Sequence, residues 1–265
     1  AIAAAGIALS MTQGWPARIP HSAIRIGELL DFKPDTPYRT GNCYLNTSHR
    51  NKRFDRASCL TPSPSKRNVL LIGDSHGAHL WHGLSVAYPN THFMQVTVSG
   101  CKPLLASHYN RWCAELQEEI FKDVIHQLQP ESILLSARWR SSHLQDVIDT
   151  VRQLQSKDIK VVVMGRIVEY QNPLPQLMAI GAWRDDSTLV NRQRVTETKT
   201  VDLQFAKALK EQGISYISTR SALCPNDVCT IATSEGLPIQ FDYGHLTADG
   251  SKLLALRLRA NGFSP

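Results

Sequence analysis

Two patterns are missing from this 265-residue sequence. It has no close Cys-x-x-Cys clusters, which argues against a structural zinc site, and no dense basic stripe interleaved with aromatic residues, which argues against a nucleic-acid partner. Charged residues are few, at 20%, and hydrophobic residues make up 42%, so a globular chain is expected rather than a disordered one. The formal net charge of +6 indicates a solvated basic surface, although an anionic partner such as a phosphorylated glycan or a membrane surface stays open.

The N-terminal residues 1–11 are almost wholly apolar, but they lack the basic start and the cleavage site of a signal peptide. They are also shorter than the run of about 20 apolar residues that a membrane-spanning helix needs. Two interpretations remain open. Residues 1–13 are either the end of a transmembrane helix that begins further upstream, with Trp15 at the membrane interface, or part of a buried N-terminal helix.

The six cysteines fall into three local pairs in loop-like surroundings: Cys43 with Cys59, Cys101 with Cys113, and Cys224 with Cys229. Spacings of 16, 12 and 5 residues do not suit a shared metal site, so we expect three disulfides with this nearest-neighbour pairing. Disulfides indicate an oxidising compartment, either the periplasm or the cell exterior. The alternative is a cytosolic protein with six reduced cysteines.

Sequence patterns divide the chain into an N-terminal extension and one α/β domain. Residues 14–67 are rich in Pro, Arg, Ser and Thr, which predicts a linker packed on a domain that spans residues 68–265. Short apolar runs predict strands at residues 68–72, 92–98, 132–136, 160–164 and 214–217. Helices are expected at residues 78–88, 112–128, 144–154, 189–212 and 247–259, with Thr247 as the last N-cap. This alternation predicts a parallel sheet covered by helices on both faces.

A candidate nucleophile follows the first predicted strand, where the apolar run ends in Gly73-Asp74-Ser75-His76. Ligands bind at the carboxyl ends of the strands in an open parallel sheet, and the start of a helix offers backbone N–H groups that stabilise an oxyanion. Near the C-terminus, Asp242 and His245 stand three positions apart. His245 is the candidate base for Ser75, and Asp242 would orient its imidazole.

These two motifs, Gly73-Asp74-Ser75-His76 and Asp242-x-x-His245, resemble those of the SGNH (GDSL-like) hydrolase superfamily. More closely, the chain resembles the SGNH domain fused behind the membrane-embedded acyltransferase-3 domain in bacterial O-antigen and related polysaccharide acetyltransferases. The resemblance implies a flavodoxin-like three-layer α/β/α sandwich with a central parallel sheet of about five strands. It also implies that Ser75 is the nucleophile, His245 the base and Asp242 its support.

The oxyanion hole of the family maps only in part onto the sequence. Ser75 and Gly100 match the backbone donors, but the stretch at residues 136–140, Ser-Ala-Arg-Trp-Arg, contains no counterpart of the family's asparagine. Arg138 is a candidate to supply a guanidinium donor instead, and Trp139 is a candidate stacking wall for a sugar ring. The alternative is that both residues only cap the sheet.

Three histidines follow the serine at intervals of three residues, namely His76, His79 and His82. At this spacing they spread around a helix rather than sharing one face, so no metal site is expected. His76 remains a candidate for lining the substrate site.

The resemblance implies an O-acetyltransferase domain that forms an acyl-serine intermediate and acetylates a sugar hydroxyl of a cell-envelope polysaccharide such as lipopolysaccharide O-antigen. No bound cofactor is expected. A fused or associated acyltransferase-3 membrane domain would supply an acetyl donor derived from acetyl-CoA, which implies a periplasmic domain anchored to the bacterial inner membrane. The alternatives are a secreted carbohydrate esterase, with water as the acceptor, and a non-catalytic glycan-binding domain. An irregular segment at residues 172–187, with Trp183, is a candidate flap over the acceptor.

Overall fold

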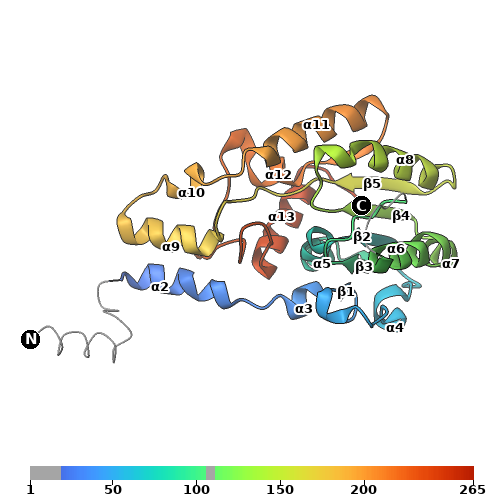
Figure 1. Cartoon of the computed structure of the whole chain (residues 1–265), viewed down its shortest axis with the longest axis horizontal. Helices are drawn as coiled ribbons and strands as arrows, with labels where there is room; N and C mark the ends of the chain where they lie inside the picture. Colours follow the sequence, from blue (N-terminus) through green and yellow to red (C-terminus); the bar gives the residue numbers. More distant parts are fainter. Residues whose placement is uncertain (1–18, 106–110) are drawn as a thin grey trace, which may run out of the picture.

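The computed structural model describes residues 19–105 and 111–265, which form one α/β unit around a six-stranded parallel sheet (Figure 1). The strands are β1 (Tyr44–Leu45), β2 (Arg67–Gly73), β3 (Thr91–Val98), β4 (Ser132–Ser136), β5 (Lys160–Met164) and β6 (Ser215–Ile217). The predicted parallel sheet is confirmed, with one strand more than expected, because β1 comes from the segment expected to be a linker. The N-terminal residues 1–13 and Trp15 lie outside the described residues.

Branched aliphatic residues form the central strands because both faces of the sheet are buried. Within β2, Leu70 and Ile72 pack into the core on one face, and Val69 and Leu71 pack into the core on the other. The strand order is β1-β3-β2-β4-β5-β6, so the chain winds from β2 to β3 on one side and then crosses to β4 on the other. The carboxyl end of β2 therefore lies where the winding reverses, which is the usual ligand site of such sheets.

Helices cover both faces of the sheet. They are α2 (His21–Gly27), α3 (Asp35–Tyr38), α4 (Arg56–Leu60), α5 (Ser75–Ala87), α6 (Arg111–Glu118), α7 (Ile125–Leu128), α8 (Leu144–Gln155), α9 (Leu174–Arg184), α10 (Leu189–Arg192), α11 (Glu197–Glu211), α12 (Thr219–Leu223) and α13 (Ala248–Ala260), with a π-helical segment η4 (Glu119–Val124) between α6 and α7. Side chains of α6, η4, α8 and α11 fill one core, and those of α5, α12 and α13 fill the other. At one end of the molecule α2 runs beside α9 (Figure 1).

Helices α5 and α13 pack against each other at very short range. The backbone N–H of Gly83 in α5 donates to Ser251 Oγ of α13 at 2.9 Å. A Cβ at Gly83 would lie 2.0 Å from the Ser251 carbonyl oxygen, so only glycine fits at this crossing. The contact fixes the start of α5, where Ser75 lies, relative to the start of α13, which follows His245.

Two segments differ from the sequence-based expectations. The stretch expected to be irregular, residues 172–187, contains the regular helix α9, which packs on α2. The helix expected over residues 189–212 is two helices, α10 and α11. An antiparallel bridge between Tyr170 and Arg194 and a hydrogen bond from the Val195 N–H to the Glu169 carbonyl separate them. The last predicted helix is confirmed, with Thr247 capping its first turn.

Three disulfides join the cysteines in the predicted nearest-neighbour pairs, Cys43–Cys59, Cys101–Cys113 and Cys224–Cys229. The first ties the start of β1 to α4, and the second ties the loop after β3 to α6. The two edge strands are the shortest of the sheet, with two residues in β1 and three in β6. Among the helices of the described ranges, none combines the length and the apolar character needed to cross a membrane.

Candidate active site

The turn between β2 and α5 places Ser75 at the carboxyl edge of the sheet. β2 ends at Gly73 and α5 begins at Ser75, so the transition from strand to helix takes a single residue, Asp74. A Cβ at Gly73 would lie 1.9 Å from the Ser136 carbonyl oxygen at the end of β4, so a glycine is required here. The Asp74 side chain caps α5 by accepting from the His76 N–H at 2.8 Å.

Asp74 also links the ends of three neighbouring strands. Its carboxylate is 1% exposed, and it accepts from Lys102 Nζ at 2.5 Å and from the Arg138 backbone N–H at 3.1 Å. Lys102 follows β3 and Arg138 follows β4, so the carboxylate draws these loops toward the nucleophile. The sequence motifs do not include Lys102. The only signal available was its position soon after a predicted strand.

Ser75, His245 and Asp242 form a continuous hydrogen-bond chain, although 170 residues separate the serine from the histidine. His245 Nε2 lies 2.8 Å from Ser75 Oγ, and His245 Nδ1 lies 2.7 Å from Asp242 Oδ2. Because a carboxylate only accepts, Nδ1 carries the imidazole proton and the Nε2 lone pair faces the serine hydroxyl. Asp242 Oδ1 accepts from the N–H groups of Gly244 and His245 at 2.8 Å each, which fixes the carboxylate. The structure therefore brings together the three residues that the two motifs predicted.

Four aromatic rings surround the imidazole of His245. The Phe241 ring stacks on it with the centroids 5.9 Å apart, and the rings of Tyr243, His76 and His79 lie at 5.7, 5.0 and 6.2 Å. Both His76 and His79 are buried, and this burial, together with the charge that His245 can carry, holds their pKa values well below the usual range. Both rings are therefore neutral near pH 7, and they do not compete with His245 for a proton.

An open pocket of about 440 Å³ lies in front of Ser75 and His245. Its volume falls in the range of small-molecule sites, roughly 300–1,000 Å³. The rest of its lining is mostly polar and includes three cations: Tyr44, Asp74, Ser99, Gly100, Lys102, Arg138, Arg140, His143 and Tyr243. Arg140 and His143 are not part of either sequence motif, because only the folded loop after β4 brings them to the serine.

Beside the Ser75 hydroxyl, the pocket offers backbone N–H groups with no acceptor among the described residues. One belongs to Ser75, the first residue of α5, and another belongs to Gly100, in the loop after β3. Gly100 has a φ of +73°, a conformation that favours glycine, and no other atom lies within 4 Å of the position a Cβ would take. Unpaired N–H groups beside a nucleophile are the donors that an oxyanion requires.

Arg138 extends to the pocket from the end of β4, and a buried carboxylate anchors it. Its Nη2 lies 2.6 Å from Glu169 Oε2, and its guanidinium carbon lies 5.0 Å from the centre of the Tyr243 ring. Glu169 is fully buried and also pairs with Arg166 at 2.5 Å. The hydrogen bond to Glu169 raises the pKa of Arg138. Glu169 binds Nε and Nη2 of Arg138, which leaves Nη1 without a partner in the described part of the chain.

Trp139 does not reach the pocket, so the expectation that it forms a stacking wall for a sugar is wrong. Its indole is buried, donates its N–H to the Met164 carbonyl at 2.9 Å and stacks on Phe205 in the core. The chain leaving β4 directs Arg138 to the pocket and Trp139 to the interior. The expectation that His76 lines the substrate site is also wrong, because its buried ring packs behind His245.

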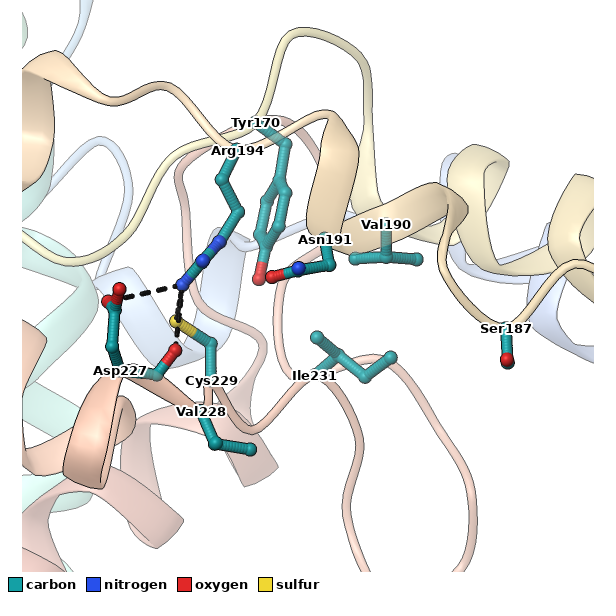
Figure 2. Close-up of a pocket in the computed structure, with 9 residues that line it drawn as sticks. All are labelled: Tyr170, Ser187, Val190, Asn191, Arg194, Asp227, Val228, Cys229 and Ile231. Atoms are coloured by element: carbon teal, nitrogen blue, oxygen red, sulfur yellow. Dashed lines mark hydrogen bonds and ion pairs between the residues drawn. The ribbon is translucent and has the colours of Figure 1, made fainter.

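A second hollow of about 290 Å³ lies between α10 and the loop closed by Cys224 and Cys229 (Figure 2). Asp227 of this loop is fully engaged, with Arg194, Lys199 and Arg220 as ion-pair partners. The lining holds no histidine beside a serine. The segment at residues 172–187 contributes one residue here and none to the pocket at Ser75, so the expected flap is not observed. The pocket at Ser75 is therefore the candidate active site.

The fold and this site define an α/β protein with a hydrogen-bonded serine, histidine and aspartate at the carboxyl edge of a flavodoxin-like sheet. Residues 42–260 match the profile of the SGNH domain (fused to AT3 domains). Because the match covers most of the sequence, the chain belongs to this family. No curated protein matches the chain.

Several solved structures are similar to this one. The periplasmic domain of the lipopolysaccharide acetyltransferase from Salmonella ser. Paratyphi A is 22% identical, with a TM-score of 0.71 and coverage of 94% of this chain and 99% of that chain. A carbohydrate acetylesterase from Sinorhizobium meliloti is 11% identical, with a TM-score of 0.47 and coverage of 74% and 98%. An acetylxylan esterase from Geobacillus stearothermophilus is 15% identical, with a TM-score of 0.43 and coverage of 77% and 98%. The first of these shows a shared fold.

Proposed function

We propose that this chain is the acyl-transfer domain of a bacterial O-acetyltransferase, which moves an acetyl group through Ser75 to a sugar hydroxyl of a cell-envelope polysaccharide such as lipopolysaccharide O-antigen. The observation that carries the proposal is the hydrogen-bond chain from Asp242 through His245 to Ser75, at the floor of a pocket of about 440 Å³. Membership of a family of domains fused to AT3 domains supports acyl transfer rather than another serine chemistry.

In the first half-reaction, His245 Nε2 takes the Ser75 hydroxyl proton while Oγ attacks the acetyl carbonyl of the donor. The tetrahedral intermediate then releases the donor's leaving group, which receives the proton from His245, and acetyl-Ser75 remains. In the second half-reaction, His245 takes the proton of a sugar hydroxyl, whose oxygen attacks the acetyl-serine carbonyl. Ser75 Oγ leaves and recovers the proton. Asp242 stabilises the imidazolium in both halves.

The negative charge that develops on the carbonyl oxygen needs donors. The free N–H groups of Ser75 and Gly100 supply two, and the unpaired Nη1 edge of Arg138 supplies a third in place of the asparagine missing from this chain. Glu169 holds the Arg138 guanidinium in place, so little reorganisation is needed as the charge forms. Loss of one such donor typically lowers kcat about 10²- to 10³-fold.

A carbohydrate esterase is the second candidate, because the pocket at Ser75 is open and water can reach the same position as a sugar hydroxyl. The residues and the first half-reaction are identical in the two cases. Water is present at roughly 55 M, so a transferase must hold its acceptor with a large effective molarity, for which intramolecular reactions reach about 10⁵ M and above.

The three disulfides support an oxidising location such as the periplasm. The family profile supports a fused or associated acyltransferase-3 membrane domain as the partner that anchors this chain to the inner membrane. In this arrangement the membrane domain delivers an acetyl donor derived from acetyl-CoA. The chain itself then needs no bound cofactor for the transfer.

The direct test is incubation of the 265-residue chain with p-nitrophenyl acetate, followed by intact-mass analysis. Acetylation of the serine adds about 42 Da. We expect this adduct, or steady turnover, in the wild type and in Ser234→Ala, which removes an exposed hydroxyl outside this pocket. Ser75→Ala and His245→Ala should show neither. An adduct of equal yield in Ser75→Ala would exclude the proposed nucleophile.

A further inference from the structure

The pocket beside the nucleophile carries more basic than acidic side chains. It is lined by Lys102, Arg138 and Arg140 against one carboxylate, Asp74. Lys102 is paired with Asp74 at 2.5 Å. Arg138 is paired with the buried Glu169, which also binds Arg166, and Glu197 lies 3.9 Å from Arg166. Lys102 and Arg138 thus each have a carboxylate partner.

Arg140 is the cation of this lining that has no counter-ion. Its side chain is exposed, and no carboxylate of the described residues lies within ion-pair distance of it. Water solvates an isolated arginine on a convex surface at little cost. Arg140 instead lines a concave site, where charges of one sign reinforce each other and attract ligands of the opposite sign.

The backbone at Arg140 is held firmly. The preceding residue, Trp139, is locked in the core, and its carbonyl accepts from Arg166 Nη1 at 2.9 Å. The Arg140 N–H donates to His143 Nδ1 at 3.1 Å. Burial, and then the positive charges of Lys102 and Arg140, lower the pKa of His143, so this neighbour adds no charge of its own. The backbone of Arg140 is therefore fixed while its guanidinium stays free. A fixed backbone reduces the entropy cost of binding a ligand.

The size of the pocket indicates where an anion would come from. An acetyl group fills only a small part of about 440 Å³. The remaining space suits the molecule whose hydroxyl oxygen receives the acetyl group. The reverse reaction, transfer of the acetyl group from that molecule back to Ser75, must follow the same path. An acetyl ester used as a donor therefore places its leaving alcohol in the same space.

We propose that Arg140 binds a carboxylate or phosphate group on the sugar that exchanges the acetyl group with Ser75, so that the preferred acceptor is an acidic sugar. This inference rests on the proposed function and adds the charge of the acceptor to it. A guanidinium suits both anions because its paired N–H groups bind two oxygens at once.

The kinetic test compares 4-acetoxybenzoate with 4-acetoxybenzamide, two acetyl esters of the same shape of which only the first is charged. We expect the kcat/KM ratio of charged to neutral ester to fall on the order of tenfold in Arg140→Ala, and further in Arg140→Glu. The neutral ester should react equally in all three proteins. Arg50→Ala removes an equal charge from an exposed position outside the pocket and should leave the ratio unchanged.

A binding test is independent of catalysis. Ser75→Ala and the double variant Ser75→Ala/Arg140→Ala are titrated with glucose, glucuronate and glucose 6-phosphate by NMR. At C5 these sugars carry a hydroxymethyl group, a carboxylate and a phosphorylated hydroxymethyl group, respectively. Tighter binding of glucuronate or of glucose 6-phosphate, lost with Arg140, supports the inference and identifies which anion is preferred.

The outcomes separate the two proposals. If p-nitrophenyl acetate acetylates Ser75 but the ester ratio is the same with and without Arg140, the inference is overturned and the proposed function stands. If Ser75 is never acetylated, the proposed function fails, and the binding test decides the inference alone. Equal affinity for all three sugars in that test would overturn it.

Discussion

Gly83 of α5 and Ser251 of α13 are in such close contact that the Gly83 N–H donates to Ser251 Oγ at 2.9 Å and no Cβ fits between the two helices. The crossing determines the distance between Ser75 and His245, because one lies at the start of α5 and the other just before α13. The geometry of the site thus depends on a glycine far from the pocket.

We expect Gly83→Ala to push α5 away from α13, with a loss of stability of about 1–3 kcal/mol and a loss of Ser75 acetylation that exceeds the loss of folded protein. Urea unfolding and the rate of p-nitrophenyl acetate turnover per folded molecule measure the two effects. Gly27→Ala is the matched control, because a Cβ there meets no other atom within 4 Å. Normal turnover in Gly83→Ala would show that the crossing does not position the site.

Asp242→Asn should abolish most activity without unfolding the chain. The asparagine Oδ1 can still accept from the N–H groups of Gly244 and His245, but its amide N–H₂ would face His245 Nδ1. The imidazole must then accept at Nδ1 and carry its proton at Nε2, where it cannot take the serine proton. We expect turnover to fall by roughly 10³- to 10⁴-fold. Asp249→Asn, an exposed position in the first turn of α13, should retain normal turnover.

Glu169→Gln should cost more stability than the loss of an ordinary surface charge. Two arginines, Arg138 and Arg166, bind this buried carboxylate. Its removal leaves Arg138 without a counter-ion and the buried Arg166 with only the exposed Glu197, at 3.9 Å. Breaking a buried pair in this way costs about 3–5 kcal/mol. Glu131→Gln, whose exposed pair with Arg67 is worth about 0–1 kcal/mol, is the control. Similar urea midpoints for the two variants would contradict this account of the buried network.

The buried histidines should make folding sensitive to mild acid. Burial lowers the pKa of His79 in the folded chain below the value of about 6.5 in the unfolded chain. As the pH falls below that value the unfolded state binds the proton first, so stability decreases by up to about 1.4 kcal/mol per pH unit for each such histidine. His79→Gln should flatten the decline between about pH 6.5 and pH 5, and His21→Gln, at an exposed position, should not. Parallel curves for His79→Gln and wild type would contradict this explanation.

Most of the sheet can be predicted from the sequence, because each buried parallel strand is a continuous apolar run that can be recognised locally. The same holds for Ser75 and His245, whose positions at predicted strand and helix ends are local features. The edge strand β1 was missed because two residues carry no periodicity. The start of α9 at Leu174 has no clear local signal, because the prolines Pro173 and Pro175 fit an irregular loop as well as the first turn of a helix.

The parts of the site that the sequence did not reveal depend on tertiary contacts. Nothing local shows that Glu169 and Lys102 are buried, since Glu169 meets Arg138 and Lys102 meets Asp74 only in the folded chain. No local signal in the sequence shows which residue of the run Arg138, Trp139 and Arg140 faces the core. The structure places the tryptophan in the core and both arginines at the pocket, which reverses the expected role of Trp139 and adds Arg140.

The shortness of the outermost strands has a consequence for the protein at high concentration. A sheet with a long free edge can recruit a strand from another molecule and start aggregation. Here one edge offers two residues of strand and the other offers three, while the long strands β2 and β3 are enclosed. Neither edge is long enough to act as a template, so copies of this domain that are crowded together should not join through their sheet edges.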